Sequence, residues 1–197
     1  MSFSKPVPLS LRSSLRLALL LAPLSLAGCG IFGSDDDPLP SAPRPCPSIA
    51  VLNETDRVTQ FNGQGTDLTD VLLRAEFNRA ALKCEYDEDD GQISVDFAFD
   101  GYAEIGAAAT SRQASLPIFI SVTRIDNGDV IVSKQLDTVP ISFEPVSPQV
   151  RFYKETEGLI IPFTDRVDGE DYQILVGFQL TPEQLAYNRR VARIPIR

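Results

Sequence analysis

The sequence predicts an all-β domain that ends in a short helix. Apolar residues recur at every second position over several short stretches, and turn residues separate these stretches. The best helix start signal stands near the C-terminus. About 150 residues follow an N-terminal leader and a proline-rich segment, which suits one domain with its own core. We therefore predict a single domain over residues 46–197.

The clearest predicted strand is 93–99, in which Ile93, Val95, Phe97 and Phe99 form one apolar face. A period of two buries one face of a strand. A second alternation runs over 116–122, and an Asn127-Gly128 pair separates it from the next apolar residues. Asn-Gly between two strands predicts a hairpin. Further strands are predicted at 150–153, 159–163 and 172–178.

The segment 70–86 is open to two interpretations. Its apolar residues alternate as in a strand over 71–77 and again over 82–86. Leu68, Val71, Leu72 and Ala75 also fit one face of a helix, and periodicity alone does not decide. We interpret the segment as two strands, because Cys84 then points inward.

The chain contains three cysteines. Besides Cys29 there are two, Cys46 and Cys84, in a chain that carries an export signal. Such a pair predicts one disulfide. Closing a loop of this length would stabilise the fold by at most roughly 4 kcal/mol. Two buried, unpaired thiols are the alternative.

Tyr172 follows Asp168 by four residues at the start of a predicted late strand. This pattern resembles the tyrosine corner of immunoglobulin-like sandwiches. The resemblance implies an immunoglobulin- or fibronectin-like β-sandwich. Ile174 stands where antibody domains have their second core cysteine, and the chain has no Trp, so an antibody-type domain is excluded. A surface tyrosine after an acidic turn is the alternative.

The predicted helix covers 182–190. Thr181 is a suitable N-cap, Pro182 suits the first helical position, and Gln184 completes a capping box. Leu180 and Leu185 are spaced to form a hydrophobic staple.

The N-terminus has the layout of an export signal. Lys5 and Arg12 precede an apolar stretch over 17–27 that is too short to span a bilayer. The following Leu26-Ala27-Gly28-Cys29 resembles the lipobox of bacterial lipoproteins. The resemblance implies that 1–28 is a cleaved signal peptide and that Cys29 is lipidated. Gly30, where an inner-membrane retention signal often has Asp, implies outer-membrane sorting with the protein facing the periplasm.

Residues 29–45 are predicted to form a linker after the lipidated cysteine. The stretch is rich in Pro and Asp and cannot form a core. An extended chain of this length reaches on the order of 50 Å. We interpret the run Asp35-Asp36-Asp37 as part of a solvated spacer and not as a metal site.

Several functions are excluded by composition. The chain has no histidine, which removes the usual nucleophile triads, His-ligated zinc and the commonest general base. The acidic run at 85–90 lacks the spacing of a calcium-binding EF-hand loop. We therefore predict no enzyme activity, no catalytic residue, no cofactor and no metal.

The charge of the chain is strongly negative. Loss of residues 1–28 removes Lys5, Arg12 and Arg16 and no acidic residue, so the net charge would fall from −9 to −12. Because an acidic surface repels phosphate backbones, we predict no nucleic-acid partner.

The leading hypothesis is a lipid-anchored, non-catalytic envelope protein that presents its sandwich to an envelope protein partner or serves envelope assembly. The predicted partner surface is the helix end at Tyr187, Asn188, Arg189 and Arg190, where basic residues also complement the helix dipole. The stretch 177–189 is similar to the ending of uncharacterised lipoproteins of alphaproteobacteria, a likeness that implies no activity. The alternative is a periplasmic module that holds an apolar or envelope-derived small ligand between its sheets.

Overall fold

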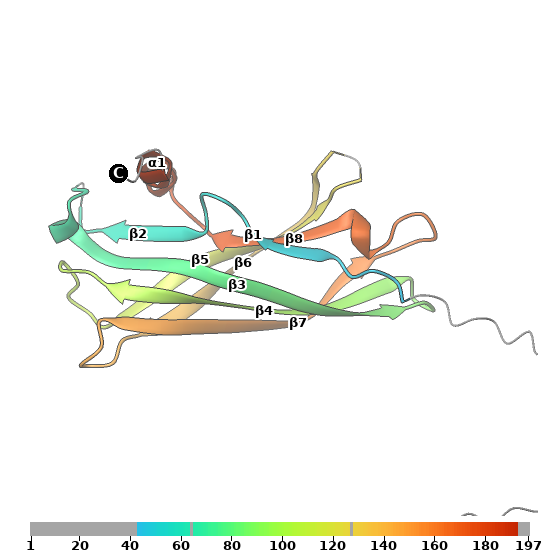
Figure 1. Ribbon diagram of the computed structural model, residues 1–197, viewed down its shortest axis with the longest axis horizontal. Coiled ribbons are helices and arrows are strands. Elements are labelled where there is room, and N and C mark those ends of the chain that lie inside the picture. Colours follow the sequence, from blue (N-terminus) through green and yellow to red (C-terminus); the bar gives the residue numbers. More distant parts are fainter. Residues whose placement is uncertain (1–42, 64, 127, 193–197) are drawn as a thin grey trace, which may run out of the picture. The chain divides into compact units, whose positions relative to one another are not determined.

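The computed structural model describes residues 43–63, 65–126 and 128–192. Within these residues, eight strands form two four-stranded sheets that pack face to face, and one α-helix follows (Figure 1). The order of strands is β1-β8-β5-β6 in sheet A and β2-β3-β4-β7 in sheet B. The predicted all-β fold with a short C-terminal helix is confirmed.

Sheet A contains β1 (Ser48–Val51), β8 (Tyr172–Phe178), β5 (Gln113–Arg124) and β6 (Val130–Ser142). Sheet B contains β2 (Arg57–Phe61), β3 (Val71–Asp87), β4 (Gln92–Ile105) and β7 (Gln149–Pro162). The one-turn helices η1 (Leu68–Asp70) and η2 (Gly169–Asp171) precede β3 and β8. Helix α1 (Pro182–Ala192) follows β8. Neighbouring strands are antiparallel except β1, which runs parallel to β8.

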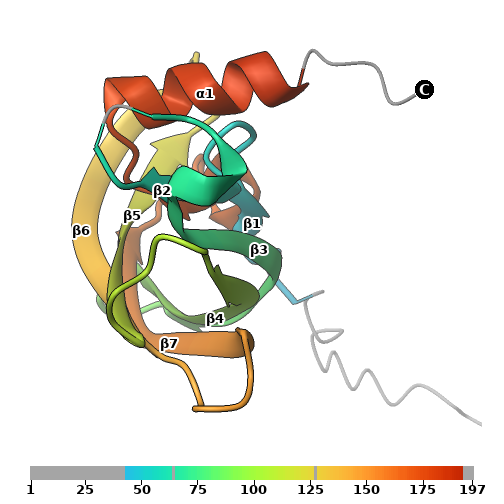
Figure 2. The same cartoon turned by 90° about the vertical axis from the view of Figure 1, so that its left-hand side faces the viewer.

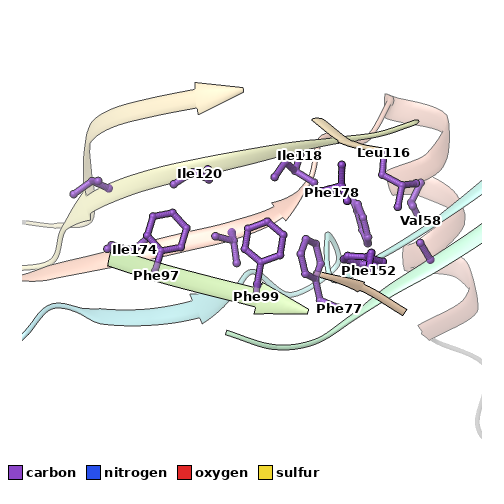
Figure 3. Close-up of a cluster of buried hydrophobic side chains, with 14 of the residues drawn as sticks. Val58, Phe77, Phe97, Phe99, Leu116, Ile118, Ile120, Phe152, Ile174 and Phe178 are labelled. Carbon is purple, nitrogen blue, oxygen red and sulfur yellow. The ribbon is translucent and has the colours of Figure 1, made fainter. Parts of the chain in front are cut away.

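The core lies between the sheets and is filled by the alternating apolar residues of both (Figure 3). In the core, the ring centroid of Phe77 lies 5.3 Å from that of Phe99, 5.8 Å from that of Phe152 and 4.4 Å from that of Phe178. These rings come from β3, β4, β7 and β8, so they join the two sheets. Offset and edge-on rings at such distances add to the stabilisation by burial.

The prediction of two strands over 70–86 was wrong, because β3 is continuous. The register with β4 shifts between Phe77 and Arg79, which leaves Asn78 as the extra residue of a bulge. Inward-facing residues have odd numbers before the bulge and even numbers after it. A bulge reverses the faces of a strand without ending it, which explains the two separate alternations. The helical interpretation was also wrong.

The two strands predicted at 150–153 and 159–163 are likewise one strand, β7. Val95 pairs with Leu159 and Phe97 with Thr156, so Glu157 and Gly158 together oppose Asp96. Gly158 has a φ of 66°, a conformation that glycine adopts without strain. Asp96 accepts a hydrogen bond from the Gly158 N–H at 2.8 Å, which stabilises the bulge.

The hairpin predicted at Asn127-Gly128 is confirmed between β5 and β6. Arg124 pairs with Val130, so the loop covers residues 125–129. Gly128 and Asp129 have φ angles of 88° and 57°.

The connectivity differs from that of immunoglobulin domains. Their last two strands, F and G, share one sheet, whereas β7 lies in sheet B and β8 in sheet A. Tyr172 opens β8 and is buried, and the alternative of a surface tyrosine is wrong.

The helix begins with the predicted capping box. The Thr181 N–H donates to Gln184 Oε1 at 2.9 Å, and the Gln184 N–H donates to Thr181 Oγ1 at 3.3 Å. Figure 2 shows α1 crossing the domain next to β2. The predicted signal peptide 1–28, Cys29 and the linker up to residue 42 lie outside the described residues.

Candidate interaction surfaces

The predicted disulfide is present and joins the start of the domain to sheet B. Cys46 lies just before β1 and Cys84 lies in the second half of β3, with Cα atoms 5.7 Å apart. The bulge at Asn78 turns Cys84 towards the core, since it shifts the inward face to even-numbered residues. The segment that enters the domain is therefore covalently bound to its longest strand.

A second set of contacts fixes the same entry point, which we call the linker junction. The Tyr86 hydroxyl donates to the Pro45 carbonyl at 2.6 Å and accepts from the Gly169 N–H at 2.7 Å. Burial raises the pKa of Tyr86, so its proton is retained for the bond to Pro45. A Cβ at residue 169 would lie 2.8 Å from the Tyr86 hydroxyl, so only glycine fits there.

Arg44 completes the linker junction from the outside. Its guanidinium lies 5.0 Å from the ring centroid of Phe163 and 5.7 Å from that of Tyr86. It also forms an ion pair with Glu88 at 2.9 Å. Residues 44–46, just before β1, are thus held by side chains from β3, its following turn and the loop after β7.

The helix end predicted as a partner surface contains residues of two kinds. Asn188 is 4% exposed, and its amide donates to the carbonyls of Glu54 and Arg57 at 2.8 Å each. Arg189 pairs with the Glu54 carboxylate at 2.9 Å. Glu54 has a φ of 67°, which is rare for a residue with a Cβ, and these bonds hold it. Asn188 and Arg189 therefore attach α1 to the sandwich.

The other two residues of this surface form a short stack. The Tyr187 ring packs edge-on against Phe61 at 5.0 Å, and the Arg190 guanidinium lies 5.7 Å from the Tyr187 ring. Arg190 is exposed. The sequence did not distinguish these roles, because the partners of α1 lie more than 100 residues earlier in the chain.

The first half of β6 is an exposed apolar edge. β6 ends sheet A, and every residue from Val130 to Leu136 is exposed. We call Val130, Ile131, Val132 and Leu136 the β6 strip; their exposed fractions are 53%, 62%, 48% and 64%. Lys134 is the one charged residue in the interval. In Figure 2, β6 is a long curved ribbon at the margin of the domain.

A groove of about 590 Å³ lies beside the β6 strip on the outer face of sheet A; we call it the sheet A groove. Its apolar lining comes from Leu52, Phe119, Ile131, Leu175, Leu180 and Leu185. Phe119, Ser121 and Thr123 of β5 point away from the core, yet they are only 8%, 4% and 4% exposed. They form the floor of the groove.

The two hydroxyl groups of the groove floor, those of Ser121 and Thr123, differ in their hydrogen bonds. The Ser121 hydroxyl donates to the Ser133 carbonyl at 3.2 Å. Thr123 Oγ1 is buried and has no hydrogen-bond partner among the described residues. A buried hydroxyl without a partner costs about 1 to 3 kcal/mol.

The outer face of sheet B carries a buried carboxylate, Asp100, which is 3% exposed. Asn78 donates to it at 2.9 Å, Arg79 at 2.8 Å and Arg151 at 2.9 Å. These hydrogen bonds, that of Asn78 first, hold the pKa of Asp100 well below its usual range. Because every donor comes from the sheet itself, the cluster fixes the β3 bulge and offers no free base.

The described part of the chain shows no constellation for metal binding. Within residues 43–63, 65–126 and 128–192, no three Cys, Asp or Glu side chains lie together as metal ligands would. In the same residues, no helix is both long and apolar enough to cross a membrane. Comparison of the chain with family models, with curated proteins and with solved structures found no match.

Proposed function

We propose that the chain is a lipid-anchored, non-catalytic protein of the bacterial cell envelope whose sandwich domain binds another envelope protein. We place its anchor in the outer membrane, on the periplasmic side. The lipobox-like sequence ending at Cys29 supports the anchor, and the absence of histidine supports a non-catalytic role. The observation that carries the binding role is the exposed apolar edge at the β6 strip.

An edge strand presents unpaired N–H and C=O groups that a second chain can complete by strand addition. Natural proteins shield such edges with charges, prolines, bulges or short strands. β1 is four residues long, and the edge of sheet B at β2 is five residues long and contacts α1. The second half of β6 contains Pro140. The first half is apolar, and Lys134 is its single charged residue. A partner strand would cover that surface.

The helix end at 187–190 is a secondary part of this proposal. Arg190 is an exposed cation, Arg189 is exposed but paired with Glu54, and Asn188 is buried against the domain. An acidic partner would meet Arg190, and removal of Asn188 would weaken the attachment of the helix.

A relationship to immunoglobulin- or fibronectin-like domains is a more specific proposal than an arrangement of two packed sheets. The buried Tyr172 at the start of β8 speaks for it, and the separation of β7 from β8 speaks against it. The second candidate function, a ligand between the sheets, would need space that the rings of Phe77, Phe99, Phe152 and Phe178 occupy. Protein binding is therefore the better supported role.

The test is site-specific photocrosslinking with the full chain in cells. A photoreactive amino acid replaces Val132 in the β6 strip or, as a matched control, Ile160 on the edge strand β7. The two positions are 48% and 51% exposed. We expect a discrete protein adduct from position 132 and not from position 160. The adduct should disappear when Ile131→Lys is added, because a charge on the strip opposes strand addition.

Two outcomes would refute the binding role: equal adducts at both positions, or an adduct that survives Ile131→Lys. The anchor is tested separately by labelled palmitate. Incorporation that persists in Cys29→Ser would refute the lipidation of Cys29.

A further inference from the structure

Two arginines on the outer face of sheet B converge on a single oxygen atom. Arg79 of β3 and Arg151 of β7 both donate to Oδ2 of Asp100, at 2.8 Å and 2.9 Å. Asp100 stands between them, because β4 lies between β3 and β7 in the sheet. Asn78 donates to the other carboxylate oxygen at 2.9 Å. Two guanidinium groups therefore meet at one point of a chain whose net charge is −9.

This cluster has a surplus of positive charge. Asp100 is ionised at neutral pH, because its hydrogen bonds, that of Asn78 first, hold its pKa well below the usual range. One guanidinium is enough to neutralise one carboxylate, so the second leaves an excess of one positive charge. Like charges held this close repel each other. An anion that contacts both Arg79 and Arg151 would reduce this repulsion.

Both arginines also keep hydrogen-bond donors that face solvent. A guanidinium has five N–H donors in a fixed fork. Among the described residues, the side chains of Arg79 and Arg151 each donate to Asp100 alone. Their exposed fractions are 71% and 51%, whereas the Asp100 side chain is 5% exposed. The buried carboxylate thus holds two forks in place and leaves most of their donors accessible.

Two exposed tyrosines flank the arginines. Tyr102 pairs across the strands with Arg151, and Tyr153 pairs with Asp100, so all four side chains lie on the same face. The exposed fractions of Tyr102 and Tyr153 are 43% and 60%. Arginine and tyrosine are the residue types that most often carry the binding energy of an interface. The two rings can contact the organic part of a molecule whose anionic group is bound between the arginines.

Two exposed acids on this face have other partners. Glu76 lies across from Arg57, and its charge, together with the stronger effect of Asp56, raises the pKa of Arg57. The Glu155 carboxylate accepts a hydrogen bond from the Tyr153 hydroxyl at 3.2 Å. Acids farther away are screened, because the Debye length is about 8 Å at physiological ionic strength. The surplus charge of the two arginines is therefore available to a ligand.

From this arrangement we propose that Arg79 and Arg151 form a binding site for a phosphomonoester, with Asp100 as the residue that positions both. A phosphomonoester has a charge of about −1.5 to −2 at pH 7 and three acceptor oxygens, so it can bond to both forks. A carboxylate has one charge and two oxygens and satisfies fewer donors. The same group occurs on soluble esters and on lipid head groups, and the test separates the two. The site lies on sheet B, so it does not rest on a partner of the β6 strip in sheet A.

The test titrates the full chain carrying Cys29→Ser with methyl phosphate at constant ionic strength. Binding is followed by the NMR signals of the arginine Nε–H groups. We expect saturable shifts at Arg79 and Arg151. The dissociation constant should be on the order of 1 mM, because the site is open to water and exposed ion pairs are weak. Dimethyl phosphate and acetate, which have a single charge each, should bind about threefold more weakly or worse.

Vesicles distinguish the two sources of the phosphate. Sedimentation compares phosphatidylcholine vesicles with vesicles that also contain phosphatidic acid. Greater binding to phosphatidic acid without binding of methyl phosphate would identify a lipid head group, and the reverse would identify a soluble ester. Both results support the site, provided that the binding depends on the two arginines. Binding of neither probe would overturn the proposal.

Arg79→Gln and Arg151→Gln should each weaken binding by roughly fivefold. Arg166→Gln, which removes an exposed arginine from the loop after β7, changes the net charge equally and should bind as the parent does. Arg151→Lys keeps the charge but loses the fork, so it should also bind more weakly. Equal binding by the parent, Arg79→Gln and Arg151→Gln would refute the site, as would an equal loss in Arg166→Gln.

A further variant keeps the test decisive if the arginine variants do not fold. Glu76→Gln removes an exposed acid from the same face and leaves both arginines in place. It should bind methyl phosphate about twofold more tightly, and unchanged binding would contradict the proposal. Loss of the crosslink at position 132 would refute the protein partner of the β6 strip alone and leave these results unaffected.

Discussion

Asp100 and Thr123 are both buried polar residues on outer sheet faces, but they differ in what the fold provides for them. Asp100 is 3% exposed and receives hydrogen bonds from Asn78, Arg79 and Arg151. Thr123 is 4% exposed and receives none among the described residues. On the outer face of sheet B, the buried carboxylate thus finds its hydrogen-bond donors within the chain. On the outer face of sheet A, the buried hydroxyl of Thr123 finds no partner among the described residues.

Two further residues lie between these extremes. The buried amide of Asn188 makes two hydrogen bonds, and the buried hydroxyl of Ser121 makes one. If the number of partners determines the contribution to stability, removal of these side chains should give a graded series. The loss of stability should fall from Asp100 to Asn188 and then to Ser121, and it should change sign at Thr123.

Asp100→Ala should give the largest loss of stability. Three donors would lose their acceptor, two of them next to the β3 bulge, and a bulge without its bonds would distort the register with β4. Thermal unfolding followed by circular dichroism at pH 7 measures the effect. Asp165→Ala, which removes an exposed carboxylate, is the control and should leave the midpoint unchanged.

The contribution of Asp100 should also depend on pH. Its folded pKa is lowered below the unfolded value of about 3.9, so the stabilisation is present above that value and is lost as the pH falls towards the folded pKa. The difference in stability between the parent and Asp100→Asn should therefore shrink from pH 5 downwards. Urea unfolding at several pH values measures it, and a constant difference would contradict the role of the ionised carboxylate.

Asn188→Ala should destabilise the domain by about 2 kcal/mol, because the carbonyls of Glu54 and Arg57 both lose their donor. Protease cleavage within α1 should become faster, since the helix is attached to Glu54 and Arg57 by this side chain. Arg190→Ala is the matched control on the same helix and should change neither quantity. An unaffected Asn188→Ala would show that α1 is held by other contacts.

Ser121→Ala and Thr123→Val should have opposite signs. The first loses one bond and should cost roughly 0.5 to 1 kcal/mol. The second removes a hydroxyl that has no partner among the described residues and should stabilise the domain by about 1 kcal/mol. Urea unfolding of both variants measures the difference, and equal losses would mean that Thr123 is satisfied by water.

Local patterns were sufficient where a side chain acts through its own strand or turn. Alternation identified 93–99 and 116–122 as strands, Asn127-Gly128 as a hairpin turn, and Thr181 with Gln184 as a helix start. Each of these depends on residues within a few positions. The pairing of Cys46 with Cys84 was also predictable, because only two cysteines remained after Cys29.

Patterns failed where a distant strand decides the outcome. The alternations at 71–77 and 82–86 were assigned to separate strands, because a change of phase looks the same at a break and at a bulge. Only the register with β4 distinguishes the two. The same holds for Gly158 in β7, whose bulge is stabilised by Asp96.

The sequence by itself determined the class of the fold, the disulfide pair and the position of the helix, because these follow from periodicity, cysteine count and local capping. Only the tertiary structure decided which buried polar side chains obtain hydrogen-bond partners. Tyr86, Asp100 and Asn188 obtain their partners from segments more than 20 residues away, and Thr123 obtains none among the described residues. The physical reason is that hydrogen bonds between strands depend on register and sheet order, which alternation within one strand does not encode.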